Sequence, residues 1–199
     1  MTHDSKKRYS GSLCQPLDPV DVYEVFWEKR FSNEGITISL RPLSLPTDEP
    51  LLRGLAALEL PDRAEMAETL FKTKKDELTM LALSDFGQSF LGMIDGQPAF
   101  LAIVHRMQQH IMGHLYPALP GDHKFSLERL PVIDGSPSDV YAFAIWQSCT
   151  DCLLEFPEVK RVITALDIFR PSEKRYCRAA GFRPLARTGG SNLEELYCR

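Results

Sequence analysis

The stretch VKRVITALD at residues 159–167, followed by a short run that ends in AAGF at residues 179–182, decides the fold of this chain. The first stretch is typical of a buried strand. Residues 171–180 are predicted to form a short helix that stops at Gly181, because glycine suits the position after a helix. Phe182 then opens another strand. The C-terminal part is therefore predicted to run strand–helix–strand.

A long amphipathic helix over residues 137–156 is predicted to precede that strand. Ser136 suits its N-cap, Pro137 its first helical position, and Asp139 can complete a capping box. Apolar side chains recur along it at helical spacing, which predicts one buried stripe. The stripe consists of Ile145, Cys149, Cys152, Leu153 and Phe156.

The N-terminal half is predicted to begin with a hairpin and two helices. Residues 20–31 and 36–43 flank an Asn-Glu-Gly turn, and the second segment alternates apolar and polar residues as a half-buried strand does. A helix over residues 49–58 is predicted to be capped by Thr47 or Asp48. A second helix is predicted over residues 62–75.

The middle of the chain is predicted to be a β meander. Residues 89–94 and 98–105 flank Asp95-Gly96-Gln97, a strong hairpin signal. Residues 123–130 form a further predicted strand, which the long helix connects to residues 159–167 as a parallel crossover. Together these elements predict an α/β fold, with a mixed, mostly antiparallel sheet and helices on both faces. If the two parallel strands splay, a ligand can enter between them.

Length and composition predict one domain, over residues 19–199, behind a flexible tail at residues 1–18. The 199 residues carry a formal net charge of −4, which gives no general field to attract nucleic acid. No apolar run approaches the ~20 residues that span a bilayer, and no signal peptide is recognised. Five cysteines, an odd number, predict free thiols in a reducing cytosol.

Several short motifs together resemble the siderophore-biosynthesis branch of the GNAT acyltransferase superfamily. They are ISLRPL (38–43), IDGQPA (94–99), Tyr116 followed by Gly121-Asp122, FPEVKRV (156–162), and Asp167 ahead of AAGF (179–182). The resemblance implies the GNAT fold, with a V-shaped splay between two parallel strands. It also implies transfer of an acyl group, acetyl above all, from acyl-CoA to an amine or hydroxylamine nitrogen of a small metabolite. It leaves the oligomeric state open, a homodimer included.

The chain departs from the family pattern at the loop that usually holds the coenzyme A pyrophosphate. GNAT enzymes carry Gln/Arg-x-x-Gly-x-Gly/Ala there, whereas residues 132–139 are VIDGSPSD, with one glycine and no basic residue. Asp139 adds a negative charge at the helix start, and Pro137 has no N–H to donate. An alternative function is therefore a catalytically degenerate GNAT-fold protein that serves as a binding or partner subunit.

The resemblance assigns candidate roles to individual residues. Asp167, at the C-terminal end of a parallel strand, is the candidate general base or amine anchor, and the alternative is a helix cap or turn residue. His123 is a second candidate base, or a solvated loop histidine. Tyr176 is the candidate acid for the departing thiolate, although Cys177 holds the position where the family places its tyrosine.

The acyl-CoA is predicted to contact one strand and one loop. Ser126, Leu127 and Glu128 lie on the strand whose backbone N–H groups polarise the thioester carbonyl in this fold. Ser136 and Ser138 lie in the degenerate loop. Ser126 also stands where the siderophore branch has a histidine.

No metal site is predicted. His110 and His114 have a spacing that could hold zinc on a helix, but Gly113 and the β-rich surroundings argue against a helix there. Cys149 and Cys152 form a Cys-x-x-Cys motif in the middle of the long helix. On its apolar stripe they are predicted to pack in the core as small hydrophobic residues.

Overall fold

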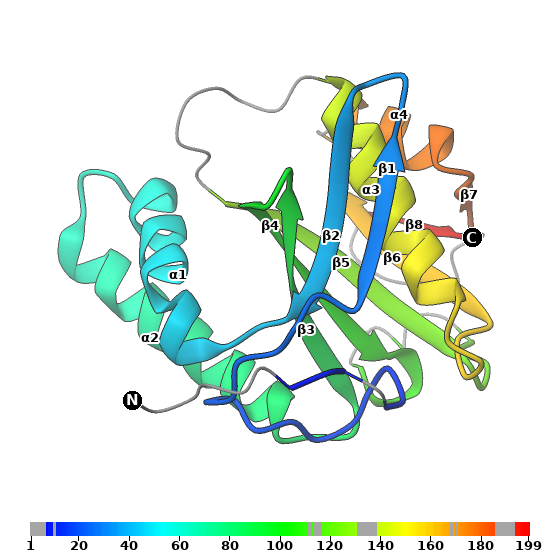
Figure 1. Ribbon diagram of the computed structural model, residues 1–199. Coiled ribbons are helices and arrows are strands. Elements are labelled where there is room, and N and C mark those ends of the chain that lie inside the picture. Colours follow the sequence, from blue (N-terminus) through cyan, green and yellow to red (C-terminus); the bar gives the residue numbers. More distant parts are fainter. Residues whose placement is uncertain are drawn as a thin grey trace.

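Eight strands form one sheet in the order β1-β2-β3-β4-β5-β6-β8-β7 (Figure 1). The computed structural model describes residues 7–9, 11–110, 113, 117–130, 139–167, 169, 171–185 and 194–199. The strands are β1 (Trp27–Phe31), β2 (Ile36–Pro42), β3 (Gly87–Ile94), β4 (Gln97–Arg106), β5 (Asp122–Arg129), β6 (Arg161–Asp167), β7 (Arg183–Pro184) and β8 (Glu194–Cys198). All neighbouring strands are antiparallel except β5 and β6, which are parallel.

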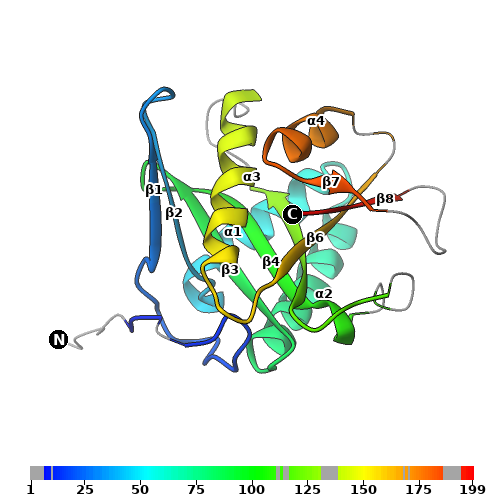
Figure 2. The same ribbon diagram turned by 90° about the vertical axis from the view of Figure 1, so that its right-hand side faces the viewer.

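Helices cover both faces of the sheet. One face carries α1 (Leu45–Glu59) and α2 (Ala64–Ala82), and the other carries α3 (Asp139–Leu154) and α4 (Pro171–Ala179) (Figure 2). A short 3₁₀ helix, η1 (Met107–Gln109), follows β4. Within the described part of the chain, no helix combines the length and the apolar character needed to cross a membrane.

Strand β4 shows how one sheet supplies two cores. Leu101 and Ile103 pack with α1 and α2, whereas Phe100, Ala102 and Val104 pack with α3. Successive side chains of a strand point to opposite faces, so a continuous apolar run serves both layers. Each such aliphatic or aromatic side chain stabilises the fold by about 1.5–3 kcal/mol when fully buried.

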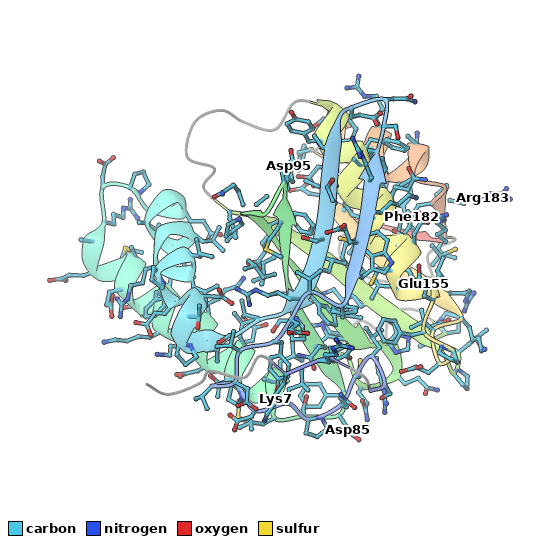
Figure 3. The ribbon with its side chains drawn as sticks, viewed as in Figure 1. Lys7, Asp85, Asp95, Glu155, Phe182 and Arg183 are labelled. Atoms are coloured by element: carbon cyan, nitrogen blue, oxygen red, sulfur yellow. The ribbon has the colours of Figure 1, made fainter. Side chains whose placement is uncertain are left out.

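The β3–β4 hairpin forms as predicted from its turn residues. Asp95 and Gly96 have φ angles of +49° and +79°, the left-handed region that a type I′ turn requires. Asp95 Oδ1 also accepts the backbone N–H of Thr37 at 2.8 Å, which fastens the turn to β2. Asp95 lies at the tip of the hairpin (Figure 3).

The N-terminal segment differs from the prediction in two respects. Strand β1 begins at Trp27 rather than near residue 20, since residues 20–26 make only one isolated bridge, from Tyr23 to Lys7. The predicted flexible tail is packed over its described second half: Leu13 is fully buried and Cys14 nearly so, both in the α3-side core. Their burial depends on tertiary contacts that a polar, Gly- and Pro-containing sequence does not reveal.

The first two helices are longer than predicted. Helix α1 begins at Leu45 with Ser44 as N-cap, so the prediction of Thr47 or Asp48 as cap is wrong. Asp48 lies in the first turn, where its carboxylate accepts the Ser44 N–H at 2.9 Å and two bonds from Arg41 at 2.9 and 2.6 Å. Helix α2 continues to Ala82, because apolar residues keep its inward stripe going past Lys75.

Candidate functional site

Strands β5 and β6 pair over three residues and then part. The parallel register joins Asp122 to Arg161, His123 to Val162 and Lys124 to Ile163. Beyond these pairs β5 runs on to Arg129 and β6 to Asp167 with no further pairing between them. The predicted splay between the two parallel strands is therefore confirmed.

The closed end of this splay is locked by a buried carboxylate. Asp122, whose side chain is 1% exposed, accepts two bonds from the Arg161 guanidinium at 2.8 and 2.7 Å. Its Oδ2 also accepts the N–H of Leu119 at 2.8 Å. Next to it, the carbonyl of Gly121 accepts the N–H of Lys160 at 2.8 Å. These bonds fix the point at which the two strands separate.

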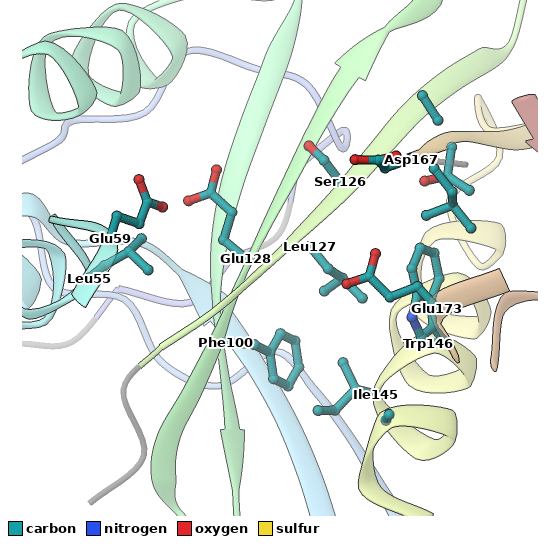
Figure 4. Close-up of a pocket in the computed structure, with 14 residues that line it drawn as sticks. Leu55, Glu59, Phe100, Ser126, Leu127, Glu128, Ile145, Trp146, Asp167 and Glu173 are labelled. Atoms are coloured by element: carbon teal, nitrogen blue, oxygen red, sulfur yellow. The ribbon is translucent and has the colours of Figure 1, made fainter. Parts of the chain in front are cut away.

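A pocket of about 640 Å³ occupies the open end of the splay (Figure 4). Its volume falls in the range of small-molecule sites. Six elements contribute to its wall: α1, β4, β5, α3, β6 and α4. The lining residues are Leu55, Glu59, Phe100, residues 126–128, Ala142, Ile145, Trp146, residues 164–167 and Glu173.

The pocket has an apolar part and an acidic part. Phe100, Leu127, Ile145 and Trp146 belong to the α3-side core or pack against it, and they provide the apolar wall. Carboxylates provide the acidic part, and none of the described lining residues is basic. The carboxylates are Glu59, Glu128, Asp167 and Glu173. A pocket of this kind suits a molecule with an apolar arm and a cationic group.

Glu128 and Asp167 occupy equivalent positions on the two parted strands. The last pair in register is Lys124 with Ile163, and each acid lies four residues further along its own strand. Parallel partners point to the same face, so both acids lie on the face of α1 and α2. The antiparallel register agrees for β5, because Glu128 stands opposite Leu101, which packs with those helices.

Glu128 is held from one side by Lys74 of α2, with which it forms an ion pair. Its other oxygen, Oε2, is buried and has no hydrogen-bond partner among the described residues. A buried carboxylate oxygen without a partner is costly and marks a place where a donor is expected. From the sequence, Glu128 is predicted to contact acyl-CoA only through its backbone, and the structure adds its side chain to the pocket wall.

Asp167 also lines the pocket, and it makes a local bond as well. Its Oδ1 accepts the backbone N–H of Phe169 at 2.8 Å, a turn at the end of β6. The turn alternative weighed for Asp167 is thus present in the structure. The same carboxylate nevertheless stands at the pocket, so both interpretations remain compatible with its position.

His123 lies apart from the pocket. It sits on the paired part of β5, is only 3% exposed, and does not line the cavity. Its Nδ1 lies 3.1 Å from the carbonyl of Gly121, and burial lowers its pKa. The expectation of a solvated loop histidine is therefore wrong. Its assignment as a second base stays a prediction, with no contact to the candidate site.

Tyr176 also lies outside the pocket lining. It is buried in the α3-side core on α4, with its hydroxyl 3.1 Å from Arg175 Nη2. Cys177 beside it is fully buried, and burial raises its thiol pKa to about 12. The structure brings Asp167 together with residues 126–128, and it does not bring Tyr176 or His123 to them.

Residues 132–138 of the degenerate loop lie outside the described residues, and with them the predicted contacts of Ser136 and Ser138. Ser126 and Leu127 line the pocket as Glu128 does. Three charged residues at the site are not predicted from the sequence: Glu59 and Glu173 line the pocket, and Lys74 pairs with Glu128. Each lies on a helix whose position against the splay depends on tertiary packing, so no local motif identifies it.

The remaining motifs are accounted for by the core. Cys149 and Cys152 are buried among apolar side chains, as predicted, and burial raises the pKa of both thiols. The rings of His105 and His110 are tilted by 59° with 5.0 Å between their centroids, and Lys124 Nζ lies 3.1 Å from His110 Nε2. Over the described ranges, no group of three or more potential ligands could hold a metal ion. His114 lies outside those ranges.

Comparison with known proteins supports the fold rather than a specific role. No protein-family model matches the sequence, and no curated protein matches it significantly. Among solved structures, an uncharacterised protein of Bacillus halodurans superposes with a TM-score of 0.71 at 14% identity, covering 86% of this chain and 88% of that one. The fold similarity extends to acetyltransferases bound to coenzyme A.

Two such acetyltransferases illustrate this similarity. Aminoglycoside acetyltransferase AAC(6')-Ib, in complex with coenzyme A and kanamycin, has a TM-score of 0.62 at 15% identity, covering 81% of this chain and 94% of that one. Mycobacterium smegmatis RimJ, in complex with CoA-disulfide, has a TM-score of 0.57 at 12% identity, covering 82% and 81%. The predicted GNAT fold is confirmed by these likenesses and by the strand order.

Proposed function

We propose that this chain is an acyl-CoA-dependent N-acyltransferase that acts on the amine of a small molecule. The observation that carries the proposal is the pocket at the open end of the β5–β6 splay, apolar on the α3 side and acidic elsewhere. Solved structures of similar fold include acetyltransferases in complex with coenzyme A, which supports an acyl-CoA as the co-substrate here.

The apolar part of the pocket fits the acyl-bearing arm of acyl-CoA. Phe100, Leu127, Ala142, Ile145 and Trp146 offer apolar contact along the splay. Because β5 and β6 no longer pair there, backbone groups on their facing sides can bind the arm. Bound acyl-CoA would supply an activated thioester carbonyl. The described residues of the pocket include no cation for its phosphates.

The acidic part of the pocket would bind and deprotonate the acceptor. Asp167 would accept the proton that the attacking nitrogen loses, as a general base does. The new C–N bond forms as the C–S bond of the thioester breaks, and the thiolate departs. Holding both reactants at one splay supplies much of the rate gain through positioning.

Calorimetric titration of the full chain with acetyl-CoA, and separately with free coenzyme A, tests this proposal. Saturable binding is expected, with an increase in stability of about 2.7 kcal/mol at a hundredfold excess over the dissociation constant. No heat and no thermal shift at millimolar cofactor would rule out the acyltransferase.

A pair of alanine-to-leucine variants tests where the arm binds. Ala142 lines the pocket from α3, whereas Ala64 is exposed at the start of α2. Ala142→Leu should weaken acetyl-CoA binding by about tenfold, because the larger side chain fills the slot, and Ala64→Leu should not. The melting temperature of each ligand-free variant shows whether the fold persists. Equal affinities for the two variants would place the arm elsewhere.

A binding or partner subunit without catalysis is the second candidate. The sequence of residues 132–139 favours it, since that loop has one glycine, no basic residue and two acids. In that case the chain would bind a cationic small molecule but neither acetyl-CoA nor coenzyme A. The siderophore-related acceptor suggested by the sequence motifs stays a prediction, because none of the structures named above is described as acting on one.

A further inference from the structure

The geometry of the acidic wall points to a compact polyamine as the acceptor, a molecule with two or more protonated nitrogens joined by short alkyl chains. We propose this as a property of the acyltransferase pocket, so it rests on the function proposed above. One nitrogen would lie against Glu59 and Glu128, and a second, the one acylated, against Asp167.

The carboxylates lie at two separate places on the pocket wall. Figure 4 shows Glu59 and Glu128 on one side of the pocket and Asp167 on the other. Glu128 and Asp167 would face each other directly if the strands stayed in register, and the splay holds them apart. Because the strands that carry Glu128 and Asp167 have separated, a single ammonium is poorly placed to contact both carboxylates. A short chain with a cation at each end is better placed to do so.

The local charge balance at the first place also favours a ligand cation. Glu59 and Glu128 together carry two negative charges, and the ion pair with Lys74 of α2 neutralises one. The buried Oε2 of Glu128 still has no described donor. An ammonium from a ligand would complete this group with a charge-assisted hydrogen bond.

Glu59 carries a negative charge at a helix position where a negative charge is unfavourable. It is the last residue of α1, at the negative end of the helix dipole, and the last turn of α1 holds no basic residue. A carboxylate is unfavourable there. Departures from local preference are expected at functional sites. Glu59 is therefore the side chain that most directly tests for a second cation.

Calorimetry on the full chain without cofactor provides the test. The probes are spermidine, 1,4-diaminobutane and n-butylamine, which share an alkylamine end and differ in their number of charges. Spermidine and the diamine should bind at least tenfold more tightly than butylamine. Glu59→Gln should remove about tenfold of the diamine affinity and leave butylamine unchanged.

Glu65→Gln is the matched control, since Glu65 is an exposed acid on α2 outside the pocket lining. It should leave all three affinities unchanged. The polyamine inference is overturned if butylamine binds as tightly as the diamine, or if Glu59→Gln weakens both equally. It is also overturned if Glu65→Gln acts like Glu59→Gln, since the attraction would then come from overall charge.

The two proposals fail in different ways. If the polyamines bind as expected while acetyl-CoA and coenzyme A do not, the acyltransferase is rejected and a polyamine-binding pocket remains. If acetyl-CoA binds but the polyamines show no preference, the acyltransferase stands and this inference is rejected. Melting temperatures of the variants, compared with the parent chain, identify any loss of affinity caused by unfolding.

Discussion

At the scale of single residues, Asp167 combines a structural and a chemical role in one carboxylate. Its Oδ1 accepts the N–H of Phe169, and the same side chain lines the pocket. Asp167→Asn keeps an oxygen that can accept this N–H but removes the charge. We expect kcat to fall by about 10²–10⁴-fold, because a general base is lost. The dissociation constant for coenzyme A should stay nearly unchanged.

Asp95→Asn is a matched control for that variant. Asp95 also accepts a backbone N–H at 2.8 Å, and it lies in the β3–β4 turn, away from the pocket lining. Asparagine tolerates the positive φ of this position. Steady-state kinetics and calorimetry should find it equal to the parent chain. Unchanged kcat in Asp167→Asn would leave Asp167 as a turn residue only.

Only the site residues that lie on a strand or at its end could be predicted from the sequence. Asp167 is predicted from the family resemblance together with its place at the end of a parallel strand, and residues 126–128 from the role that the resemblance gives to their strand. Glu59 was not predicted, since nothing in α1 itself shows which strands its last turn approaches. His123 and Tyr176 lie near, but not at, the positions where the family has its histidine and tyrosine, and burial keeps both out of the pocket lining.

At the scale of elements, the junction before β5 depends on Gly121. Its φ is +89°, and an added Cβ would lie 2.5 Å from Lys160 Cγ and 3.1 Å from the carbonyl oxygen of Glu158. Gly121→Ala should therefore lower the free energy of unfolding by about 3 kcal/mol, through backbone strain and overpacking. Urea denaturation measures this change.

Gly96→Ala separates the two causes. Gly96 also has a positive φ, +79°, but an added Cβ would have no neighbour within 4 Å. Only the backbone cost remains, so the expected loss is about 1 kcal/mol. An equal loss of unfolding free energy in the two variants would show that close contact of the new Cβ with Glu158 and Lys160, just before β6, adds no strain.

Elements whose position depends on the conformational preference of their own residues are predicted correctly. Elements whose position depends on contacts with residues far along the chain are not. The Asp95-Gly96 turn requires positive φ angles, and its sequence supplies them. The start of α1 depends instead on Asp48, whose carboxylate is held by Arg41 of β2. The N-terminal segment at Leu13 contains too few apolar residues to reveal that it is buried.

At the scale of the whole molecule, two partly buried histidines predict a loss of stability in mild acid. Burial, and to a smaller extent the neighbouring charges, lower the pKa of His105 and of His110 from 6.5 to about 4. The charge of Lys124 acts on both histidines, and that of His110 also acts on His105. The unfolded chain therefore takes up protons at a higher pH than the folded chain. The stability they contribute is complete above pH 6.5 and is lost as the pH falls toward 4.

Urea unfolding at about pH 7 and at about pH 5 measures this loss of stability, because the two values lie above and below the ordinary pKa of histidine. The double variant His105→Gln, His110→Gln cannot titrate there, so its midpoint should fall less between the two values than that of the parent chain. An equal fall in both proteins would assign the acid sensitivity to other groups.

The parting of β5 from β6 gives the sheet two inner edges in addition to the outer ones at β1 and β7. Outer edges are where sheets recruit other chains, and proteins usually protect them. The inner edges face each other across a slot, so another sheet cannot dock on them. An extended ligand with its own amide groups can do so, by pairing as an added strand would. The slot can thus select ligands by an extended, amide-containing backbone as well as by their charge.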